Sequence, residues 1–425
     1  MKILIDHGGY PVLNIGDLAM LQVAIQRLCG LWSNPSIQVF TTSPEKLAKY
    51  CPNTTPLLPS GRNTWLSTLV SPAYKIPSRG FVQLWSNWED HLRRQSPEIV
   101  RSFIELKLKL KGNSSELASD FQVFMEAFHE ADLVIACGGG YITDSFKYHA
   151  SGVLDTLDLA NSIGKPIAMF GQGLGPLRDP DLRAKARAVL PKAKLISLRE
   201  QRSGIPILKS FNISSDRFIV TGDDAIEMSY QKRNPNTGDG IGINLRIANY
   251  ANIDADLIET VRTTLQDAAK SLSAPLIPVP ISLKAEGKEL SDSMAIRELL
   301  KGYDDASDGG QLIDTPHKVI EQIGLCRVVV TGSYHAGVFA LAQGIPVVCL
   351  AKSEYYADKF LGLADQFGVG CQVIFMNNQQ LKENLLAAIF QSWNDSEQLR
   401  LQLLAAAEHQ ISLGRTAYKN LYDMI

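Results

Sequence analysis

The chain has 425 residues, with 42 Lys plus Arg against 44 Asp plus Glu, so its formal net charge is −2. Hydrophobic residues make up 45% of it and charged residues 20%. This composition excludes an intrinsically disordered chain, which combines low hydrophobicity with high net charge. It also disfavours a protein that nucleic acid holds through an extended basic surface. The length predicts two or three domains of roughly 150 residues each.

Metal and redox chemistry find no support in the residue spacing. No two of the six cysteines lie within three residues of each other, which excludes a CxxC pair, and we expect all of them to be reduced. The seven histidines show neither HExxH nor a pair four residues apart. We therefore expect no metal and no cofactor.

The opening segment MKILIDHGGY has an apolar run too short for a signal peptide. No stretch of the chain approaches the roughly 20 apolar residues of a membrane helix. The sequence therefore predicts a cytoplasmic protein without a transmembrane segment, and it leaves contact with a membrane surface open.

The first half of the chain alternates predicted strands with glycine-bearing or polar loops. A strand at residues 2–5 and a turn-rich loop precede a helix at 18–31 and a strand at 37–41. A helical insertion at 61–130 follows. Further strands are predicted at 132–136, 166–170, 195–198 and 217–220. This order indicates a parallel α/β sheet, in which the carboxyl ends of the strands form a binding crevice.

A polar linker at 231–239, with Pro235 and Gly238, precedes a second alternation of the same kind. It has strands at 240–245, 275–279, 328–331 and 346–350, and a helix at 255–271. Two helices, 378–392 and 396–412, close the chain. We predict an α/β fold with two Rossmann-like domains of parallel sheets facing a cleft, over residues 1–232 and 238–385. Helices in 386–425 are expected to pack back on the first domain.

The segment TGSYHAG, residues 331–337, follows an apolar strand and precedes a helix. Backbone N–H groups in such a turn favour anions. His335, beside Ser333 and Tyr334, can therefore serve as an acid, a base or a donor to phosphate. The alternative is a histidine that caps the helix or binds a carbonyl.

Three cations follow predicted strands and are candidates for an anion site. Arg199 comes directly after the strand at 195–198 and can hold a phosphate or a carboxylate in bidentate fashion. Lys352 and Lys359 follow the strand at 346–350. The alternatives are a surface salt bridge for the arginine and solvated side chains for the lysines.

Glycine-rich loops follow three strands and allow a ligand to approach the backbone closely. Asp17 is expected to cap the first helix, and Asp144 is either a general base or a cap. None of these loops has the spacing of a P-loop or of a dinucleotide fingerprint. The candidates for substrate binding in these loops are Gly8, Gly9, Asn14, Asp17, Gly139, Gly140, Asp144 and Gly173.

Taken in order, several segments resemble the polysaccharide pyruvyl transferase family: GGYPVLNIGDLAML, ADLVIACGGGYITD, GQGLGP, ISLREQRS, TGSYHAGVFALAQGIPVVCL and AKSEYYADKF. The resemblance implies the two-domain fold called GT-B. It also implies transfer of the enolpyruvyl unit of phosphoenolpyruvate to two hydroxyls of a glycan acceptor, free or linked to a lipid or a nucleotide. A cyclic ketal forms and phosphate leaves, in the synthesis of exopolysaccharides of the cell envelope. The oligomeric state stays open.

Family members use an arginine in a motif like SxRExxS and a histidine in a motif like RxH, and these match Arg199 and His335. The arginine two residues before the histidine is replaced by Ser333 in this chain. Either Lys352, Lys359 or Arg246 supplies the missing charge, or the donor differs. Two other functions stay open: a glycosyltransferase that uses a nucleotide sugar, and a binding module without catalysis.

Overall fold

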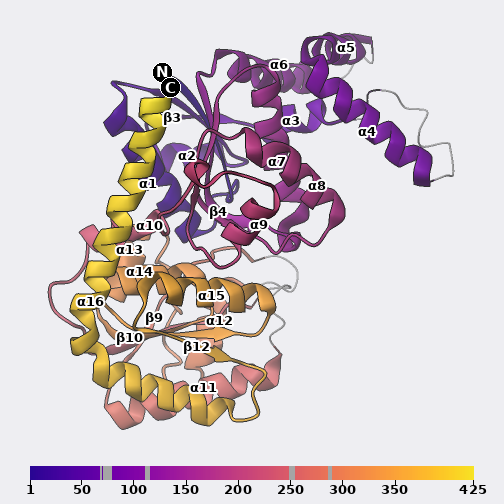
Figure 1. Ribbon diagram of the computed structural model, residues 1–425. Coiled ribbons are helices and arrows are strands. Elements are labelled where there is room, and N and C mark those ends of the chain that lie inside the picture. Colours follow the sequence, from indigo (N-terminus) through magenta and orange to yellow (C-terminus); the bar gives the residue numbers. More distant parts are fainter. Residues whose placement is uncertain (68, 70–78, 111–114, 248–253, 286–289) are drawn as a thin grey trace.

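Two all-parallel sheets organise the chain, which confirms the predicted fold class (Figure 1). The computed structural model describes residues 1–67, 69, 79–110, 115–247, 254–285 and 290–425. The first sheet has the strand order β3-β2-β1-β4-β5-β6-β7. Its strands are β1 (Lys2–His7), β2 (Ser36–Phe40), β3 (Thr54–Leu57), β4 (Leu133–Ile142), β5 (Ile167–Leu174), β6 (Ile196–Leu198) and β7 (Phe218–Val220).

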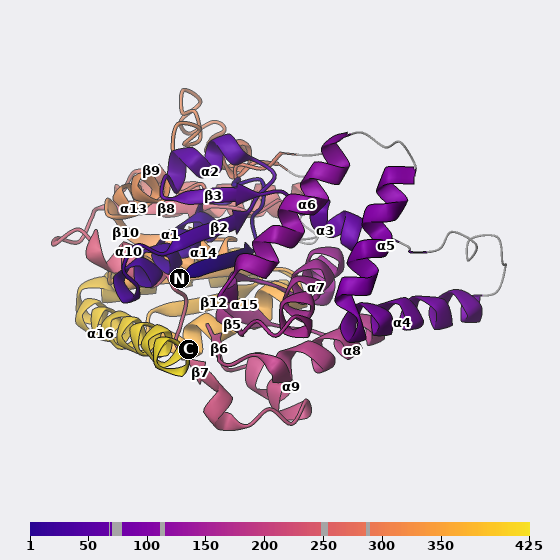
Figure 2. The same cartoon turned by 90° about the horizontal axis from the view of Figure 1, so that it is seen from above.

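Helices cover both faces of the first sheet, because its central strands are buried on each side and need apolar partners. They are α1 (Ile15–Leu31), α2 (Pro44–Tyr50), α3 (Pro59–Trp65), α4 (Arg79–Gln95), α5 (Pro97–Leu110), α6 (Ser115–Glu130), α7 (Lys147–Ser162), α8 (Pro180–Val189), α9 (Gly204–Ser210) and α10 (Ala225–Gln231). Figure 2 shows α4, α5 and α6 grouped on one side, where the sequence predicted a helical insertion.

The second sheet has the order β12-β11-β10-β8-β9. Its strands are β8 (Gly240–Asn244), β9 (Leu276–Pro278), β10 (Cys326–Thr331), β11 (Val347–Ala351) and β12 (Cys371–Phe375). Its helices are α11 (Ala255–Leu272), α12 (Asp292–Leu300), α13 (Pro316–Ile323), α14 (Tyr334–Ala342), α15 (Glu354–Phe367) and α16 (Leu381–Met424). The division of the chain between residues 232 and 238 stays a prediction.

The two predicted closing helices are one helix, α16, of 44 residues. The break expected between residues 392 and 396 is absent, because Ser396 donates to the carbonyl of Trp393 and the helix continues. No proline or glycine interrupts the helix before Gly414. In Figure 1, α16 (yellow) runs along one side of both sheets.

The C-terminal half of α16 completes the core of the first sheet. The ring of Tyr418 stacks on Phe170 of β5 at 3.8 Å between centroids, and its hydroxyl donates to Asp224. Arg27 of α1 pairs with Asp224 at 2.6 Å and with Glu227 at 2.7 Å, and all three side chains are buried. This ion cluster fixes α1, α10 and α16 to one another.

The two sheets share an apolar contact. One core cluster joins Ile15, Ala19 and Met20 of α1 to Val338 and Phe339 of α14. The start of α1 therefore packs on the helix that carries the TGSYHAG motif. No helix in the described part of the chain is both long and apolar enough to span a bilayer.

Candidate functional site

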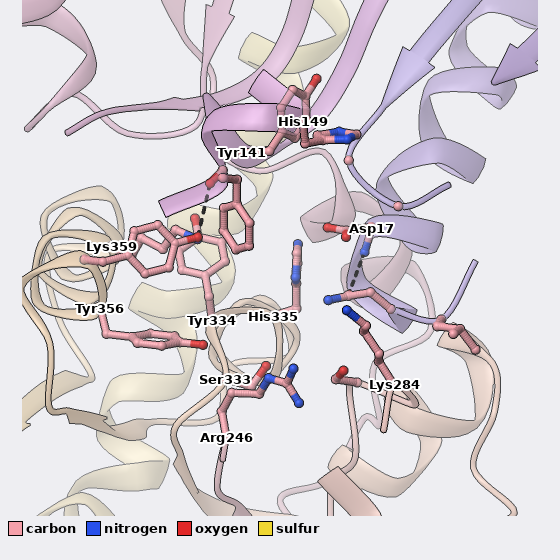
Figure 3. A pocket seen from close by; sticks show the side chains of 18 of the residues that line it. Asp17, Tyr141, His149, Arg246, Lys284, Ser333, Tyr334, His335, Tyr356 and Lys359 are labelled. Carbon is pink, nitrogen blue, oxygen red and sulfur yellow. Dashed lines mark hydrogen bonds between the residues drawn. The ribbon is translucent and has the colours of Figure 1, made fainter. Parts of the chain in front are cut away.

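A cavity of about 360 Å³ lies where the carboxyl ends of both sheets meet. Loops after β1 and β4, together with Arg199 after β6, line it from the first sheet. The start of α14 and helix α15 line it from the second. Parallel α/β sheets place ligands at this edge of the strands. Figure 3 shows side chains from both sheets pointing into the same space.

Most of the residues predicted from the sequence come together in this cavity. They are Gly8, Gly9, Asn14, Asp17, Gly140, Arg199, Ser333, Tyr334, His335 and Lys359. Four others are absent from the described lining: Gly139, Gly173, Asp144 and Lys352. The functional roles of all fourteen stay predictions.

Arg199 is 2% exposed and projects from the end of β6 into the cavity. Its guanidinium lies over the ring of Tyr334, with Cζ 4.1 Å from the ring centroid. Its Nη1 lies 3.5 Å from Oδ2 of Asp223. Its Nε and Nη2 are buried and have no hydrogen-bond partner in the described part of the chain. Buried N–H groups are normally paired. These two donors therefore suit a ligand that brings a hydrogen-bond acceptor into the cavity. The surface salt bridge considered for this arginine is therefore wrong.

Asp223 links Arg199 to His335, and the sequence reasoning did not single it out. It follows β7, and its Oδ1 accepts the backbone N–H of Ala225 at the start of α10. Its Oδ2 lies 3.6 Å from Nε2 of His335 and accepts no hydrogen bond in the described part of the chain. Burial raises the pKa of Asp223 to about 6, although Arg199 opposes the shift.

His335 sits at the predicted strand-to-helix turn, in the first turn of α14. It is 6% exposed, and its Nε2 also lies 3.4 Å from Sδ of Met20. Burial lowers the pKa of His335 well below its usual value, and the charges of Arg199 and Lys359 lower it further. The ring is therefore neutral at physiological pH while the cavity holds no added charge.

Lys359 of α15 adds a second basic side chain to the site, and this side chain is half-buried. Its Nζ contacts the hydroxyl of Tyr355 and lies 3.8 Å from the centroid of that ring. The Tyr355 hydroxyl donates to the carbonyl oxygen of Gly140 at 3.1 Å, which ties α15 to β4. Burial, with Arg199 nearby, lowers the pKa of Lys359 well below its usual range. An anion beside it would restore its charge.

The predicted capping role of Asp17 is wrong, because Asn14 is the cap of α1. The Asn14 side chain accepts the backbone N–H groups of Gly16 and Asp17 at 3.0 and 3.1 Å. The sequence signal was present, since asparagine is as good a cap as aspartate and begins the helix three residues earlier. The carboxyl of Asp17 is left to line the cavity, where burial raises its pKa to about 6.

Glycines leave the space that the side chain of Arg199 occupies. A Cβ on Gly140 would lie 2.2 Å from Nη2 of Arg199, and one on Gly173 would lie 2.8 Å from its Nε. Gly139 has a φ of +132°, a conformation that other residues rarely adopt, and a Cβ there would meet the ring of Tyr141. These loops therefore shape the site through the space they leave.

Asp144 and Lys352 were predicted to bind substrate, but neither is in the described lining of the cavity. Asp144 accepts backbone N–H groups from Arg178 at 2.8 Å and Asp179 at 3.1 Å, so it holds the loop before α8. Lys352 follows β11, and the described lining of the cavity does not include it.

The second sheet supplies two more cations to the cavity, Arg246 and Lys284. Figure 3 shows Arg246 beside Ser333, at the position where the family pattern expects an arginine. The backbone N of Arg246 would lie 2.9 Å from a Cβ on Gly332, which places the two loops in contact. Its Nη1 lies 3.2 Å from Oδ1 of the buried Asp292. Arg246 was one of three candidates for the missing charge, whereas Lys284 was not predicted.

Acidic, histidine and cysteine side chains do not gather into a metal-binding group in the described ranges. Tyr355 and Tyr356 also line the cavity, and the sequence reasoning quoted them without giving them a role. Their signal was weak, because two adjacent tyrosines on a helix are more often part of a core.

Comparison with solved structures gives the same fold over the whole chain. A UDP-GlcNAc 2-epimerase from Neisseria meningitidis bound to UDP-GlcNAc is 13% identical with a TM-score of 0.53, covering 100% of this chain and 99% of that one. A UDP-GlcNAc 2-epimerase from Methanocaldococcus jannaschii is 11% identical with a TM-score of 0.55 and coverages of 100% and 99%. Anabaena HepE in complex with UDP is 12% identical with a TM-score of 0.52 and covers 100% of both chains. These likenesses establish a fold of the GT-B kind.

No curated protein matches the chain in sequence. The sequence profile of the family described as polysaccharide pyruvyl transferase matches residues 14–354, which include Arg199, Asp223 and His335. The profile thus spans most of both sheets and the whole first turn of α14. The chain belongs to the polysaccharide pyruvyl transferase family.

Proposed function

We propose that this protein transfers the pyruvyl group of phosphoenolpyruvate to two hydroxyls of a sugar in a polysaccharide or its precursor. The product is a cyclic ketal, and the phosphate is released. In this reaction the methylene carbon of the donor gains a proton, each acceptor hydroxyl forms a bond to the neighbouring carbon, and the bond to the phosphate oxygen breaks.

The observation that carries the proposal is a pair of N–H groups on buried Arg199 that find no hydrogen-bond partner among the described residues. A buried guanidinium with two free donors suits a planar carboxylate or a phosphate, which accepts such donors in bidentate fashion. Lys359 lies close enough to influence the same space, since the charge of Arg199 contributes to lowering the pKa of Lys359. A small dianion between them would satisfy both cations. Phosphoenolpyruvate carries both anionic groups.

His335 acts in this proposal as a hydrogen-bond donor to the phosphate or as the general acid. It lies at the N-terminal turn of α14, where the helix dipole favours negative charge. A bound dianion would raise the pKa of the imidazole from its low starting point, because an opposite charge nearby favours the protonated ring.

We assign Arg246 and Lys284 to binding of the acceptor. They line the cavity from the second sheet, next to Ser333, and Tyr355 and Tyr356 offer flat apolar faces nearby. We propose that these residues receive a glycan acceptor, and that the two cations contact a phosphate that links it to a nucleotide or a lipid. Arg246 then also supplies the charge that Ser333 lacks.

A second candidate is transfer from a nucleotide sugar. Two of the similar solved structures favour it, since the Neisseria meningitidis enzyme is bound to UDP-GlcNAc and Anabaena HepE is in complex with UDP. In that case Arg199 and Lys359 would hold the diphosphate leaving group.

The test is mass spectrometry of candidate glycans incubated with the protein and phosphoenolpyruvate, with released phosphate measured in parallel. A mass gain of pyruvic acid less one water, with one phosphate per ketal, is the expected result. UDP sugars are offered in a matched reaction. Sugar transfer without ketal formation would overturn the proposal and support the second candidate.

A further inference from the structure

Asp17 is the one carboxylate among the described residues that line the cavity. The donor of the proposed reaction is an anion, which a carboxylate repels. The hydroxyls of the acceptor are neutral and donate hydrogen bonds, and an ionised carboxyl only accepts them, so Asp17 suits the acceptor. The basic side chains of the lining, which suit the anionic donor or a phosphate, are Arg199, Arg246, Lys284 and Lys359.

The carboxyl of Asp17 has no hydrogen bond and no ion pair to any residue within the described ranges. Its oxygens are not among the fully buried polar atoms that lack a partner, so they remain open to the cavity. The two basic groups whose charges act on it contact other side chains. Nη1 of Arg199 lies 3.5 Å from Oδ2 of Asp223, and Nζ of Lys359 contacts the hydroxyl of Tyr355. The carboxyl is therefore available to a ligand.

Asp17 lies next to the residue proposed as the general acid. The preceding residue, Gly16, packs against the ring of His335, since a Cβ on Gly16 would be 2.0 Å from Cγ of the imidazole. A Cβ on Gly9 would lie 3.3 Å from Oδ2 of Asp17, so the glycine loop after β1 borders the carboxyl. Figure 3 shows Asp17 pointing into the same space as His335.

The acceptor side of the cavity is joined to the same segment of the chain. The backbone N–H of Leu283 donates to the carbonyl oxygen of Leu13 at 2.8 Å. This bond holds the loop that carries Lys284 against the start of α1. Lys284 is one of the two residues to which we assign the phosphate of the acceptor. Asp17 thus lies between the positions proposed for the donor and for the acceptor.

A structural role accounts poorly for this carboxyl. An acid in the first turn of a helix complements the helix dipole, but Asn14 already caps α1. Burial raises the pKa of Asp17 to about 6, although Lys359 and Arg199 oppose the shift. The folded state therefore disfavours the charged form. Carboxyls perturbed in this way within a cavity are typical of functional sites.

We propose that Asp17 is the general base that takes the proton of the first acceptor hydroxyl. The inference rests on the proposed function, because it requires a sugar hydroxyl as the attacking group. A general base must reach that hydroxyl through a hydrogen bond, and the available oxygens of Asp17 can accept one inside the cavity.

His149 is the alternative base among the described lining residues. Its Nε2 lies 3.0 Å from the carbonyl oxygen of His7, which fixes the proton on that nitrogen and leaves Nδ1 as the acceptor. Its ring stands edge-on to Tyr10 and Tyr141, with centroids 4.8 and 5.1 Å apart. This packing gives His149 a place in the wall of the cavity that needs no catalytic role.

The proton balance closes over one turnover. The proton of the first hydroxyl moves to Asp17 while the hydroxyl oxygen bonds to the carbon that bears the phosphate. The methylene carbon takes a proton from the general acid and becomes a methyl group. The second hydroxyl bonds to the same carbon as the carbon–oxygen bond to phosphate breaks, and its proton leaves on the phosphate. The proton on Asp17 replaces the one that the general acid gave up.

Asp17→Asn in the full chain tests the inference, because asparagine keeps the size and a hydrogen-bond acceptor but cannot take the proton. The kcat of ketal formation should fall by about 10²–10⁴-fold, with little change in KM for the acceptor. Calorimetric titration without acceptor should show phosphoenolpyruvate bound at least as tightly as by the wild type. Asp256→Asn, which changes an exposed carboxylate at the start of α11, is the control and should keep kcat.

The pH dependence of kcat/KM gives a second readout, because a base acts only in its unprotonated form. In the wild type, kcat/KM should rise with pH through the pKa of Asp17, which is about 6, and then level off. The donor phosphate titrates in the same range. The measured quantity is therefore the slope of log kcat/KM below pH 6, which should be smaller by about one in Asp17→Asn. The titratable groups around Asp17 are unchanged in the variant, and they are Arg199, Lys359, His335, Asp223, Cys137 and Tyr141.

The outcomes separate the inference from the proposed function. Ketal formation by the wild type with a near-normal kcat in Asp17→Asn would overturn the inference alone, as would weaker donor binding by the variant. A slope that survives in Asp17→Asn and is lost in His149→Gln would give the role to His149. A wild-type profile that is flat below pH 6 would overturn the inference without any variant. An absence of ketal from the wild type would overturn the proposed function and the inference with it.

Discussion

Gly16 of α1 lies directly against the imidazole ring of His335 in the opposite half of the molecule. A Cβ on Gly16 would be 2.0 Å from Cγ and 2.1 Å from Nδ1 of that ring. The start of the first helix therefore determines where the histidine of the second sheet can stand. No other residue type fits at position 16 without moving the ring.

Gly16→Ala is expected to displace His335 and to lower kcat by about 10²-fold, the loss that a misplacement near 1 Å produces. Gly30→Ala is the matched control, because Gly30 lies in the same helix and a Cβ there meets nothing within 4 Å. The control should keep its activity and gain up to about 1 kcal/mol of stability. Equal activity of the two variants in the ketal assay would contradict the prediction.

His335→Ala should reduce turnover by about 10²–10⁴-fold if the imidazole serves as a general acid or stabilises the phosphate. His409→Ala, at an exposed position of α16, should leave turnover unchanged. The measurement is the rate of ketal formation with a suitable acceptor. Near-full activity of His335→Ala would remove the histidine from the mechanism.

Arg199→Lys keeps the charge but loses the planar fork that can hold an anion with two parallel hydrogen bonds. We expect affinity for the donor to fall by about 10-fold or more, the equivalent of one hydrogen bond to a charged group. Arg202→Lys changes an exposed arginine three residues away and should have no effect. The check is the Kd for phosphoenolpyruvate, and equal values for both variants would speak against a donor held by Arg199.

Asp17→Asn should stabilise the protein at neutral pH while it impairs the site. The raised pKa of about 6 means that the folded state holds this proton more tightly than the unfolded chain. Its contribution to stability is therefore greatest below the unfolded pKa near 4 and is lost as pH rises through 6. We expect a gain of about 1–3 kcal/mol at pH 7.5 that disappears at pH 4, measured by urea unfolding. A gain of the same size at both pH values would show that charge is not the cause.

Arg27→Ala should destabilise the protein by about 3–5 kcal/mol, because Asp224 and Glu227 would remain buried with their main cation removed. Arg415→Ala is the comparison. Arg415 also pairs with Glu227, but its side chain is 60% exposed, so its loss should cost under about 1 kcal/mol. Chemical denaturation of both variants at pH 7.5 gives the loss of unfolding free energy in each. A larger loss in Arg415→Ala than in Arg27→Ala would contradict the stabilising role given to Arg27.

The fold was predictable because each buried strand is a short apolar run that ends in a loop of glycine or polar residues. His335 and Arg199 could be found for the same reason, since both follow such runs directly. Asp223 also follows a strand, but its role depends on the pairing of β7 with β6, which places it beside Arg199. Lys284 lies on a long loop, and no local pattern brings it to the cavity.

The continuity of α16 has a consequence for how the chain folds. Its 44 residues amount to about 66 Å measured along the helix, and Ala417, Tyr418 and Leu421 belong to the same apolar cluster as strands β1 and β2. The first strands of the protein thus obtain some of their packing partners only when residues beyond 415 have left the ribosome. During synthesis, the apolar surface that Tyr418 covers on Phe170 stays exposed until then, so the core of the first sheet is completed only after the end of α16 has been made.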